Sequence, residues 1–413
     1  MRIGIVGAGV AGLTLAWLVD GVHECVVLET RQDVGGNLRS QRFIDDRGVA
    51  RTVDLGVREV SLEGFTLFAR LARSVGLADG DWSDRPTTHT VRRAGQERPL
   101  YRGSLTETAH SGEAERAVAT FTRAAVDWAA KDLPWSVSLG EMVEPWPVSA
   151  TMKTDLIYAL AAAIWACDVT EAATLSARAV GTQFASDAPA GHVPTSQFLR
   201  NGMQDLAWRL AAQLTTAELR PAAALQHVRR VGERWVMTDC GGVAHQIDAI
   251  VLAVPADIAA DTLKPLAGTE PVRRALSMYR YADIHQGAHL DPCYLPKDRR
   301  QWSTTNTVVD GSWASSTLHY RFDDESEAFV SQLAHQERLP RHLLARASFR
   351  TLLPFPEMFA GLAQLSEAQG QDGLYFAGHV MGHVASQEAA VASAVEVAKI
   401  LAPHSPRLAT LTL

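Results

Sequence analysis

The chain opens with apolar and small-residue blocks that predict a strand, a helix and a second strand. Residues 2–6 (RIGIV) form a short apolar run, and residues 11–20 (AGLTLAWLVD) carry Leu15 and Leu18 at helical spacing. Residues 24–29 (ECVVLE) form a second apolar run, which is typical of a strand in a buried parallel sheet. This order predicts a βαβ unit at the start of the chain.

The pattern changes twice farther along. From about residue 61 to 195, helical periods dominate, in 62–77 (LEGFTLFARLARSVGL), 115–131 (ERAVATFTRAAVDWAAK) and 154–169 (TDLIYALAAAIWACDV). From about residue 196 strands return, as two strands around Gly232-Glu233, a buried strand in 249–255 (AIVLAVP), and an apolar run in 374–378 (LYFAG) before a small-residue helix.

The first predicted strand leads into a complete GxGxxG motif. Gly7 permits the tight turn, Gly9 lets the backbone approach a pyrophosphate, and Gly12 allows close packing of helix on strand. Glu29 ends the second strand, where a carboxylate can bind ribose hydroxyls. The motif with its strands and acid predicts dinucleotide binding; the alternative is a glycine loop with a structural role only.

The next residues distinguish the cofactors that use this fold. Arg31, Gly35, Gly36, Arg39 and Ser40 form an R-x3-GG-x3-S pattern. At this point the sequence resembles the flavin-containing amine oxidoreductase superfamily, which includes monoamine oxidases, protoporphyrinogen oxidases and phytoene desaturases. The resemblance implies that this segment follows the pyrophosphate and ribityl chain of FAD, whereas a pair of glycines alone would indicate a plain turn.

Three further segments resemble the same superfamily. Residues 53–60 (VDLGVREV) resemble its D-x-G stretch at the flavin end, and Leu225 matches a strand position whose backbone contacts adenine. LYFAG and the helix after it resemble the segment that closes over the flavin. His379 stands where many members have an acid, and Ser393-Ala394 replaces a Ser-Gly pair. We expect binding to survive both changes, because backbone amides and the helix dipole supply much of the interaction.

The resemblance therefore implies non-covalent FAD, since no cysteine follows Cys293 that could form a C-terminal flavin bond. No metal is expected. The cofactor-binding residues that it implies are Gly7, Gly9, Val10, Ala11, Gly12, Glu29, Thr30, Arg31, Gly35, Gly36, Asn37, Leu38, Arg39, Leu55, Gly56, Val57, Arg58, Leu225, Gly378, His379, Ala389 and Ala390.

A closer resemblance covers nearly the whole chain, less evenly between 60 and 150. Residues 281–306 resemble a bacterial subgroup of predicted NAD/FAD-binding, amine-oxidase-like flavoproteins, in His289, Asp291, Leu295-Pro296, Trp302 and Asn306. Thr305 replaces the second Trp of the subgroup's Trp-x-x-Trp-Asn stretch. Residues 162–167 (AAIWAC) fit the same subgroup.

Candidates for chemistry are histidines and tyrosines that can exchange protons, and aromatic rings that can wall a pocket. We predict His289, His379, Tyr281, Trp165 and Trp302. A hydrogen-bonded structural role remains the alternative for each histidine. Amine-oxidising members hold a water near the flavin with a lysine of the substrate sheet, and here only Lys297 lies between 266 and 350, in a turn. Amine oxidation is therefore less favoured.

Composition and charge exclude several classes. The formal net charge of −7 and the pI near 6.1 argue against a nucleic-acid binder. The four cysteines are far apart, without zinc or disulfide spacing. No apolar run is long enough to span a bilayer, and no secretory signal is expected, because the first apolar run is predicted to be a strand. A cytoplasmic protein that binds a small-molecule substrate is expected, and the sequence carries no signal for an oligomeric state.

We thus expect an α/β fold with a doubly wound Rossmann-type FAD-binding domain and a second α+β substrate domain, as in amine oxidases. The first domain would comprise 1–60, 196–265 and 351–413, and the second 61–195 and 266–350. The expected function is an FAD-dependent oxidoreductase of oxidase or desaturase type that transfers a hydride from a small or medium organic substrate to flavin N5. Alternatives are a redox-neutral flavin-dependent isomerase or cyclase, an NAD-dependent dehydrogenase, and a non-catalytic flavin-binding protein.

Overall fold

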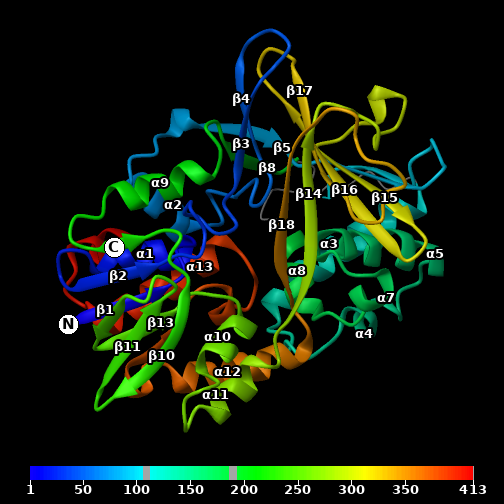
Figure 1. Ribbon diagram of the computed structural model, residues 1–413. Coiled ribbons are helices and arrows are strands. Elements are labelled where there is room, and N and C mark those ends of the chain that lie inside the picture. The colour runs from blue at the N-terminus through cyan, green and yellow to red at the C-terminus, as the bar shows by residue number, and fades with distance from the viewer. Residues whose placement is uncertain (106–111, 186–192, 413) are drawn as a thin grey trace.

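The computed structural model describes residues 1–105, 112–185 and 193–412. A parallel sheet of five strands forms the core of one half of the molecule, coloured mainly blue, green and red in Figure 1. Its strand order is β19-β13-β1-β2-β9, and every neighbouring pair is parallel. The strands are β1 (Arg2–Val6), β2 (Glu24–Leu28), β9 (Glu218–Arg220), β13 (Ala249–Leu252) and β19 (Leu374–Phe376).

Two helices from opposite ends of the chain pack together against this sheet. They are α1 (Val10–Val19), all of whose residues are buried, and α13 (Gln387–Leu401). Leu13, Leu15 and Val391 belong to one apolar core with Ile3 and Ile5 of β1. The other side of the sheet packs on an antiparallel meander of β10 (Leu225–Val231), β11 (Arg234–Asp239) and β12 (Ala244–Ile247).

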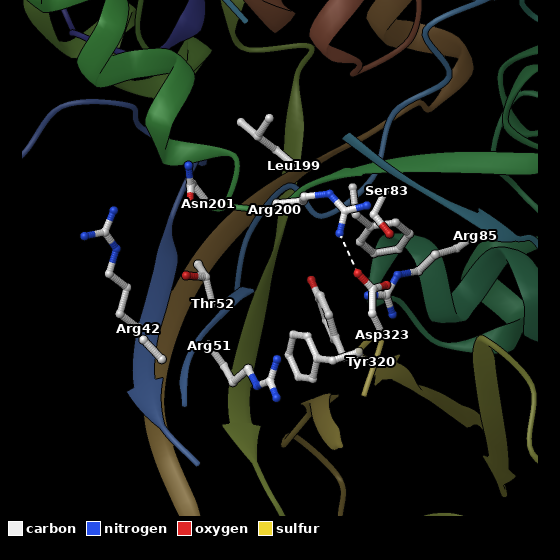
Figure 2. Close-up of a pocket in the computed structure, with 13 residues that line it drawn as sticks. Arg42, Arg51, Thr52, Ser83, Arg85, Leu199, Arg200, Asn201, Tyr320 and Asp323 are labelled. Atoms are coloured by element: carbon white, nitrogen blue, oxygen red, sulfur yellow. Dashed lines mark hydrogen bonds and ion pairs between the residues drawn. The ribbon is translucent and has the colours of Figure 1, made fainter. Parts of the chain in front are cut away.

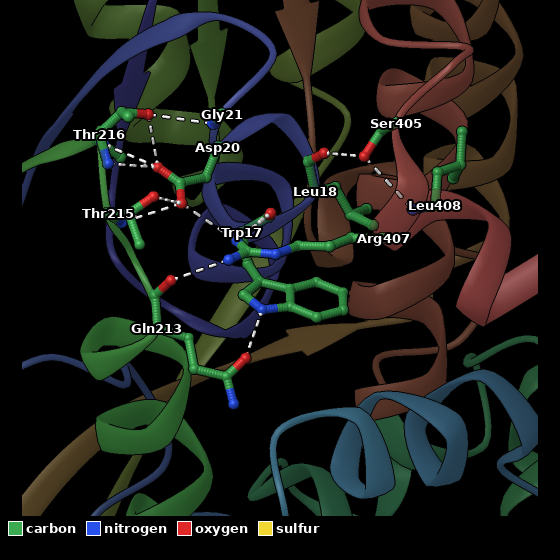
Figure 3. Close-up of polar contacts among 11 residues, drawn as sticks. Trp17, Leu18, Asp20, Gly21, Gln213, Thr215, Thr216, Ser405, Arg407 and Leu408 are labelled. Carbon is green, nitrogen blue, oxygen red and sulfur yellow. Dashed lines mark hydrogen bonds and ion pairs between the residues drawn. The ribbon is translucent and has the colours of Figure 1, made fainter.

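A buried carboxylate joins three distant parts of the chain next to α1. Asp20 ends that helix and accepts hydrogen bonds from both the backbone and hydroxyl groups of Thr215 and Thr216, at 2.8–2.9 Å, and from the amide of Ala217 at 2.9 Å (Figure 3). Arg407 near the C-terminus donates to the same carboxylate at 3.2 Å. Although burial opposes the shift, the bonds from the threonines hold the pKa of Asp20 well below its usual range.

The second half of the molecule is built on a seven-stranded sheet. The strand order is β18-β14-β17-β16-β15-β6-β7, antiparallel except for the β15–β6 pair. The strands are β6 (His89–Arg93), β7 (Tyr101–Gly103), β14 (Arg280–His289), β15 (Thr305–Asp310), β16 (Trp313–Arg321), β17 (Glu327–Gln332) and β18 (Leu343–Leu353). The long strands β14 and β18 lie between the two halves in Figure 1.

Shorter elements complete the fold. Two strand pairs are β3 (Ser40–Ile44) with β4 (Ala50–Asp54), and β5 (Trp82–Pro86) with β8 (Thr195–Leu199). The other α-helices are α2 (Thr66–Ser74), α3 (Glu113–Ala130), α4 (Leu139–Val143), α5 (Ala150–Met152), α6 (Ala159–Trp165), α7 (Val169–Ala172), α8 (Ala177–Phe184), α9 (Gln204–Ala212), α10 (Ala256–Leu263), α11 (Glu270–Leu276), α12 (Pro356–Ala368) and α14 (Pro406–Thr412). Single turns are η1 (Asp79–Asp81), η2 (Lys153–Tyr158), η3 (Arg299–Gln301), η4 (Gln371–Gly373) and η5 (His379–Met381).

The predicted fold class is confirmed: a parallel Rossmann-type sheet is combined with a second, sheet-rich unit that carries helices. The βαβ unit at the start and the hairpin around Gly232 are also confirmed. One element differs, because 154–169 is not one regular helix. The π-helical turn η2 comes first, and α6 ends at Ala166 with a φ of 52°. Among the described helices, none is long and apolar enough to cross a membrane.

Candidate functional site

The first glycine loop is held tightly on the protein side and is open on the other. The amide of Gly7 donates to the carbonyl of Leu28 at 2.8 Å, which fixes the turn between β1 and α1. A Cβ on Gly12 would lie 1.9 Å from the carbonyl oxygen of Gly7. A Cβ on Gly9 would meet only the Cα of Gly36, at 3.9 Å. Gly12 therefore serves the packing of α1 on the loop, whereas Gly9 leaves the backbone open to a ligand at the start of α1.

The second glycine segment lies directly on this loop. Gly35 donates its amide to the carbonyl of Ala8 at 2.8 Å, and Gly9 and Gly35 form an isolated parallel bridge. Arg31 donates from Nη1 to the carbonyl of Gly36 at 2.8 Å. Residues separated by about 25 positions thus form one continuous backbone surface, and both Gly35 and Gly36 have positive φ, at 114° and 59°.

Glu29 fixes the same surface through its carboxylate. It accepts the amide of Ala8 at 2.8 Å through Oε2 and the amide of Arg31 at 3.0 Å through Oε1. The side chain is buried just beyond the end of β2, at the carboxyl edge of the parallel sheet. This is the edge at which ligands bind in open α/β sheets.

The segment from Leu55 to Arg58 pairs with residues 37–39. Leu55 donates its amide to the carbonyl of Arg39 at 2.8 Å, and Val57 donates to that of Asn37 at 3.0 Å. Gly56 allows this approach, since a Cβ there would lie 1.9 Å from the carbonyl oxygen of Asn37. The D-x-G stretch and the second glycine segment are therefore neighbours.

The C-terminal segment reaches the first loop. A Cβ on Gly378 would lie 3.7 Å from the methyl group of Ala11, and the amide of Gly378 donates to Ser393 Oγ at 2.8 Å. Ser386 caps α13 by accepting the amide of Ala389 at 3.1 Å. The two ends of the chain thus meet at the starts of α1 and α13, and we call the surface formed by 7–12, 29–39, 55–58 and 378–390 the cradle.

Three buried polar atoms in the cradle have no hydrogen-bond partner within the described part of the chain. They are Arg39 Nε, Arg58 Nη1 and Gln387 Oε1. Buried polar groups are nearly always paired, so such atoms call for a partner. Burial, with the nearby charge of Arg31, lowers the pKa of Arg39, and its guanidinium lies 5.2 Å from the ring centroid of Phe349. Two cationic donors and an open glycine backbone fit an anionic dinucleotide.

The remaining predicted cofactor residues lie as follows. Val10, Ala11, Leu38 and Ala390 are buried, and Thr30 is exposed beside Glu29. Leu225 is the first residue of β10 and pairs with Asp239. The cradle contacts described above do not include Leu225, and its backbone contact to adenine stays a prediction.

The seven-stranded sheet has one face toward the cradle, which we call the inner face. Ala288, Val330 and Leu318 on this face share an apolar cluster with Val53 and Leu55. Phe349 belongs to it too, and the Cβ of a residue at position 56 would lie 2.8 Å from its ring. Because side chains alternate along a strand, Phe329, Ser331 and His319 lie on the opposite, outer face.

Two predicted catalytic residues lie on this outer face. His289 is fully buried, bonds Ser331 Oγ through Nε2 at 2.8 Å and stacks on Phe329 at 5.6 Å between centroids. Burial lowers its pKa to about 4. Trp302 also contacts Phe329, at 5.8 Å, and donates from Nε1 to the carbonyl of Pro296 at 2.7 Å. Phe329, which both side chains contact, lies on the face turned away from the cradle.

Tyr281 lies elsewhere again. It is eight residues before His289 on β14, which corresponds to about 26 Å along an extended strand. Its hydroxyl accepts the amide of Ala256 at 2.8 Å, and Arg350 lies over its ring at 4.6 Å from the centroid. Burial raises the pKa of the hydroxyl to about 12. Tyr281 is thus a hydrogen-bonded residue beside α10, apart from His289 and Trp302.

The other two candidates lie nearer the cradle. His379 begins the turn η5 directly after Gly378 and is half-buried, and burial lowers the pKa of its imidazole. Trp165 ends α6, a helix on the inner side: Gln332 of β17 donates to the carbonyl of Ala163 in that helix at 2.6 Å. The structure therefore does not gather the five predicted catalytic residues into one constellation.

Gln286 is a residue that the sequence reasoning missed. It pairs with Ala347 of β18 and Gln332 of β17, so it lies on the inner face, diagonal to Phe349 and about 7–8 Å from it. It is only 4% exposed, and its Oε1 has no partner among the described residues. The signal was the apolar series Ala282, Ile284 and Ala288 at every second position, because the strand period of two places Gln286 on the same face.

Comparison with known proteins agrees with this geometry. Residues 5–70 match the model of an NAD(P)-binding Rossmann-like domain. Three solved structures resemble the chain at low identity. They are cyclohexylamine oxidase from Brevibacterium oxydans IH-35A (15% identity, 97% of this chain and 99% of that one, TM-score 0.69), putrescine oxidase bound to putrescine (16%, 97% and 99%, 0.67), and a CLA-producing fatty acid isomerase from P. acnes (14%, 97% and 98%, 0.68).

The similarity extends over nearly the full length of each of these structures. It therefore includes both the half built on the parallel sheet and the half built on the seven-stranded sheet. At such identities a likeness concerns architecture and leaves the reaction open. The chain shares the two-domain fold of these solved structures.

Proposed function

We propose that this protein is an FAD-dependent oxidoreductase that transfers a hydride from a small or medium organic substrate to flavin N5, in C–C desaturation or C–N oxidation. The observation that carries the proposal is the cradle, in which four distant segments surround an approachable glycine backbone. Arg39 and Arg58 supply buried, unpartnered donors there. FAD would be held without a covalent bond.

In this proposal the chain's own groups have distinct tasks. The amides at Gly9 and at the start of α1 would bind the pyrophosphate, and Arg39 would balance its charge. Glu29 would accept from the ribose of the adenosine half. Gly378 would let the backbone approach the ring system, and Gly56 would hold its segment against Asn37 beside it. Bound FAD supplies the hydride acceptor, and the protein supplies orientation and exclusion of water.

We further propose that Gln286 contacts the substrate and that His379 exchanges protons near the ring system. Gln286 is buried on the inner face with a free carbonyl oxygen, so it could accept a hydrogen bond from a substrate amine or hydroxyl. His379 with a lowered pKa is neutral at pH 7, so it could accept a proton. Trp165 would close the substrate site on the side formed by α6.

A redox-neutral flavin-dependent isomerase or cyclase is the second candidate. Lys297, the lone lysine between 266 and 350, is 89% exposed and pairs with Glu97 at 3.4 Å, away from the cradle. It therefore offers no support for the lysine-held water of amine oxidation. One of the similar structures is a fatty acid isomerase. This candidate uses the same cofactor and the same inner face.

We propose that the cofactor is bound by residues 1–60, 196–265 and 351–413, and that the substrate is bound by 61–195 and 266–350. The division is supported by β1, β2, β9, β13 and β19, which build the parallel sheet, and by β14–β17 of the second sheet, while β8 and β18 cross its boundaries. The site would lie where the inner face meets the cradle, since ligand sites are common between domains.

An anaerobic substrate screen tests the proposal. Purified protein loaded with FAD is mixed with small amines, alcohols and unsaturated acids without oxygen, and the visible absorbance of the oxidised flavin is followed. Bleaching by a substrate, with formation of an oxidised product, is expected of the oxidoreductase. Turnover of a substrate without lasting bleaching would replace it by the isomerase. FAD binding with no turnover across all classes would contradict both.

A further inference from the structure

A cavity of about 390 Å³ is lined by residues outside the glycine loops. It is enclosed by the β3–β4 hairpin, by β5 and β8, and by the end of β16 with the turn after it (Figure 2). Four arginines line it, together with the single carboxylate of Asp323; they are Arg42, Arg51, Arg85 and Arg200. Its volume lies within the usual range of small-molecule sites.

Two of these arginines are already engaged. Arg51 binds Asp45 at 2.9 Å and also contacts Asp324. Arg42 lies over the ring of Trp208, 5.5 Å from its centroid. Arg51 is therefore paired with carboxylates, and in Figure 2 the guanidinium of Arg42 points away from Arg85 and Arg200, so those two arginines remain for an anion.

Arg85 forms no close ion pair in the part of the chain that the structure describes, although the charges of Asp323 and Glu59 act on it at longer range. It lies over the rings of Phe198 and Tyr320, at 4.9 and 5.4 Å from their centroids. Within the described residues, no carboxylate lies within 4.0 Å of it, and its buried Nε has no partner. A desolvated guanidinium that lies on two aromatic rings retains its planar fork of donors for a carboxylate or phosphate.

Arg200 provides a second cation on the same side. It pairs with Asp323 at 2.9 Å, but both side chains are exposed, at 48% and 81%. Such an exposed pair is weak, so an incoming anion can replace Asp323 at little cost. Figure 2 shows Arg85 and Arg200 approaching Asp323 from two different segments, β5 and the turn after β8.

We propose that this cavity binds a small organic anion through a carboxylate or phosphate group held by Arg85 and Arg200. The inner wall links the site to the cradle, because the amide of Asp54 donates to the hydroxyl of Tyr320 at 3.1 Å and Asp54 directly precedes Leu55. The proposal concerns residues outside the cradle and does not depend on the reaction proposed above.

Calorimetric titration of the protein as purified, with FAD added to saturation, tests this site. Succinate and inorganic phosphate serve as anionic probes, and neutral succinamide serves as the control ligand. Saturable binding of at least one anion, without binding of succinamide, is expected. Preference for succinate or for phosphate identifies which headgroup the site takes.

Variants localise the binding. Arg85→Gln should weaken the anion at least tenfold, because a bidentate charge-assisted pair is lost, and Arg85→Lys should weaken it less. Arg321→Gln is the matched control, since Arg321 lies on β16 outside the cavity and pairs with Glu325; its affinity should stay within twofold. Arg200→Gln, at a half-exposed position, is the second variant if Arg85→Gln does not fold.

Failure of both anions to bind the wild-type protein would overturn the proposal. So would equal binding by the wild-type protein and by folded Arg85→Gln and Arg200→Gln variants, because the anion would then lie elsewhere, for example on the cradle. In that case Arg85 serves only to pack against Phe198 and Tyr320. Loss of FAD binding would leave the anion titration interpretable, because the two sites share no residue.

Discussion

The cradle and the seven-stranded sheet differ in the kind of contact on which their proposed functions depend. In the cradle, contacts run through backbone amides, carbonyls and positions where only glycine fits, such as Gly12 and Gly56. In the sheet, function depends on which face a side chain occupies, and His289 and Gln286 lie three positions apart on opposite faces. A motif can therefore identify the first region, whereas the second requires the register of the strands.

The buried carboxylate of Asp20, at the end of α1 opposite the cradle, gives the largest expected effect. Asp20→Asn leaves five donors and Arg407 facing an amide, and we expect it to cost about 3 kcal/mol of unfolding free energy at pH 7. Chemical denaturation measures this, with exposed Asp79→Asn as the control. Because the folded pKa of Asp20 is lowered, its contribution is present above about pH 4 and falls as the pH drops below it. An equal loss at pH 2.5 and pH 7 would contradict this reason.

Gly9→Ala separates binding from folding within the cradle. Gly9 has an ordinary φ of −76°, and a methyl group there would meet only the Cα of Gly36. We expect FAD affinity to fall about 100-fold, or about 2.7 kcal/mol, while the melting temperature of the apoprotein changes little. Fluorescence titration with FAD measures the affinity. Gly80→Ala, at an open surface position, is the control, and unchanged affinity in Gly9→Ala would move the pyrophosphate away from this loop.

The two faces of the sheet can be compared by matched substitutions. Gln286→Leu should lower the rate of flavin reduction by substrate about tenfold, because a hydrogen bond of about 1.4 kcal/mol is lost. His289→Asn should change that rate less than twofold and lower stability instead, since His289 is buried against Phe329 and Ser331. Stopped-flow absorbance follows the reduction. A larger rate loss for His289→Asn would return the catalytic role to the outer face.

Asp54 lies between the two regions, and its effect depends on pH. It accepts bonds from Ser40 at 2.6 Å and Met203 at 2.9 Å, and burial raises its pKa to about 7. The unfolded carboxyl ionises near pH 3.9, so wild-type stability should fall between about pH 4 and 7, and Asp54→Asn should not show this fall. Between pH 5 and 7.5 the unfolding free energy of the wild-type protein should fall relative to that of Asp54→Asn by about 2.5 kcal/mol, which chemical denaturation at the two pH values measures. Parallel pH profiles would mean that Asp54 is ionised in the folded protein.

Much of the cradle was predictable from sequence, and little of the substrate side. Gly7, Gly9, Gly12 and Glu29 have fixed spacing because the βαβ geometry imposes it. Gly378 was found by resemblance, and its contact with Ala11 brings it to the first loop. His289, Tyr281 and Trp302 were chosen by residue type, which carries no information about faces.

The cavity lined by Arg85 was not predicted at all. Its walls come from β4, β5, β8 and β16, which are separated by up to about 270 residues, and no local motif marks their meeting. Arg85 and Arg200 each look like ordinary surface arginines in the sequence. Their side chains come together only where the β3–β4 hairpin lies beside β5 and β8.

The central claim is that the cradle binds FAD, and the visible absorption spectrum of the purified protein tests it most directly. The spectrum is repeated on the supernatant after denaturation, with FAD added first to any colourless preparation. The account predicts a yellow protein, or one that takes up FAD, and release of free FAD into the supernatant. A colourless protein that does not take up added FAD would contradict it.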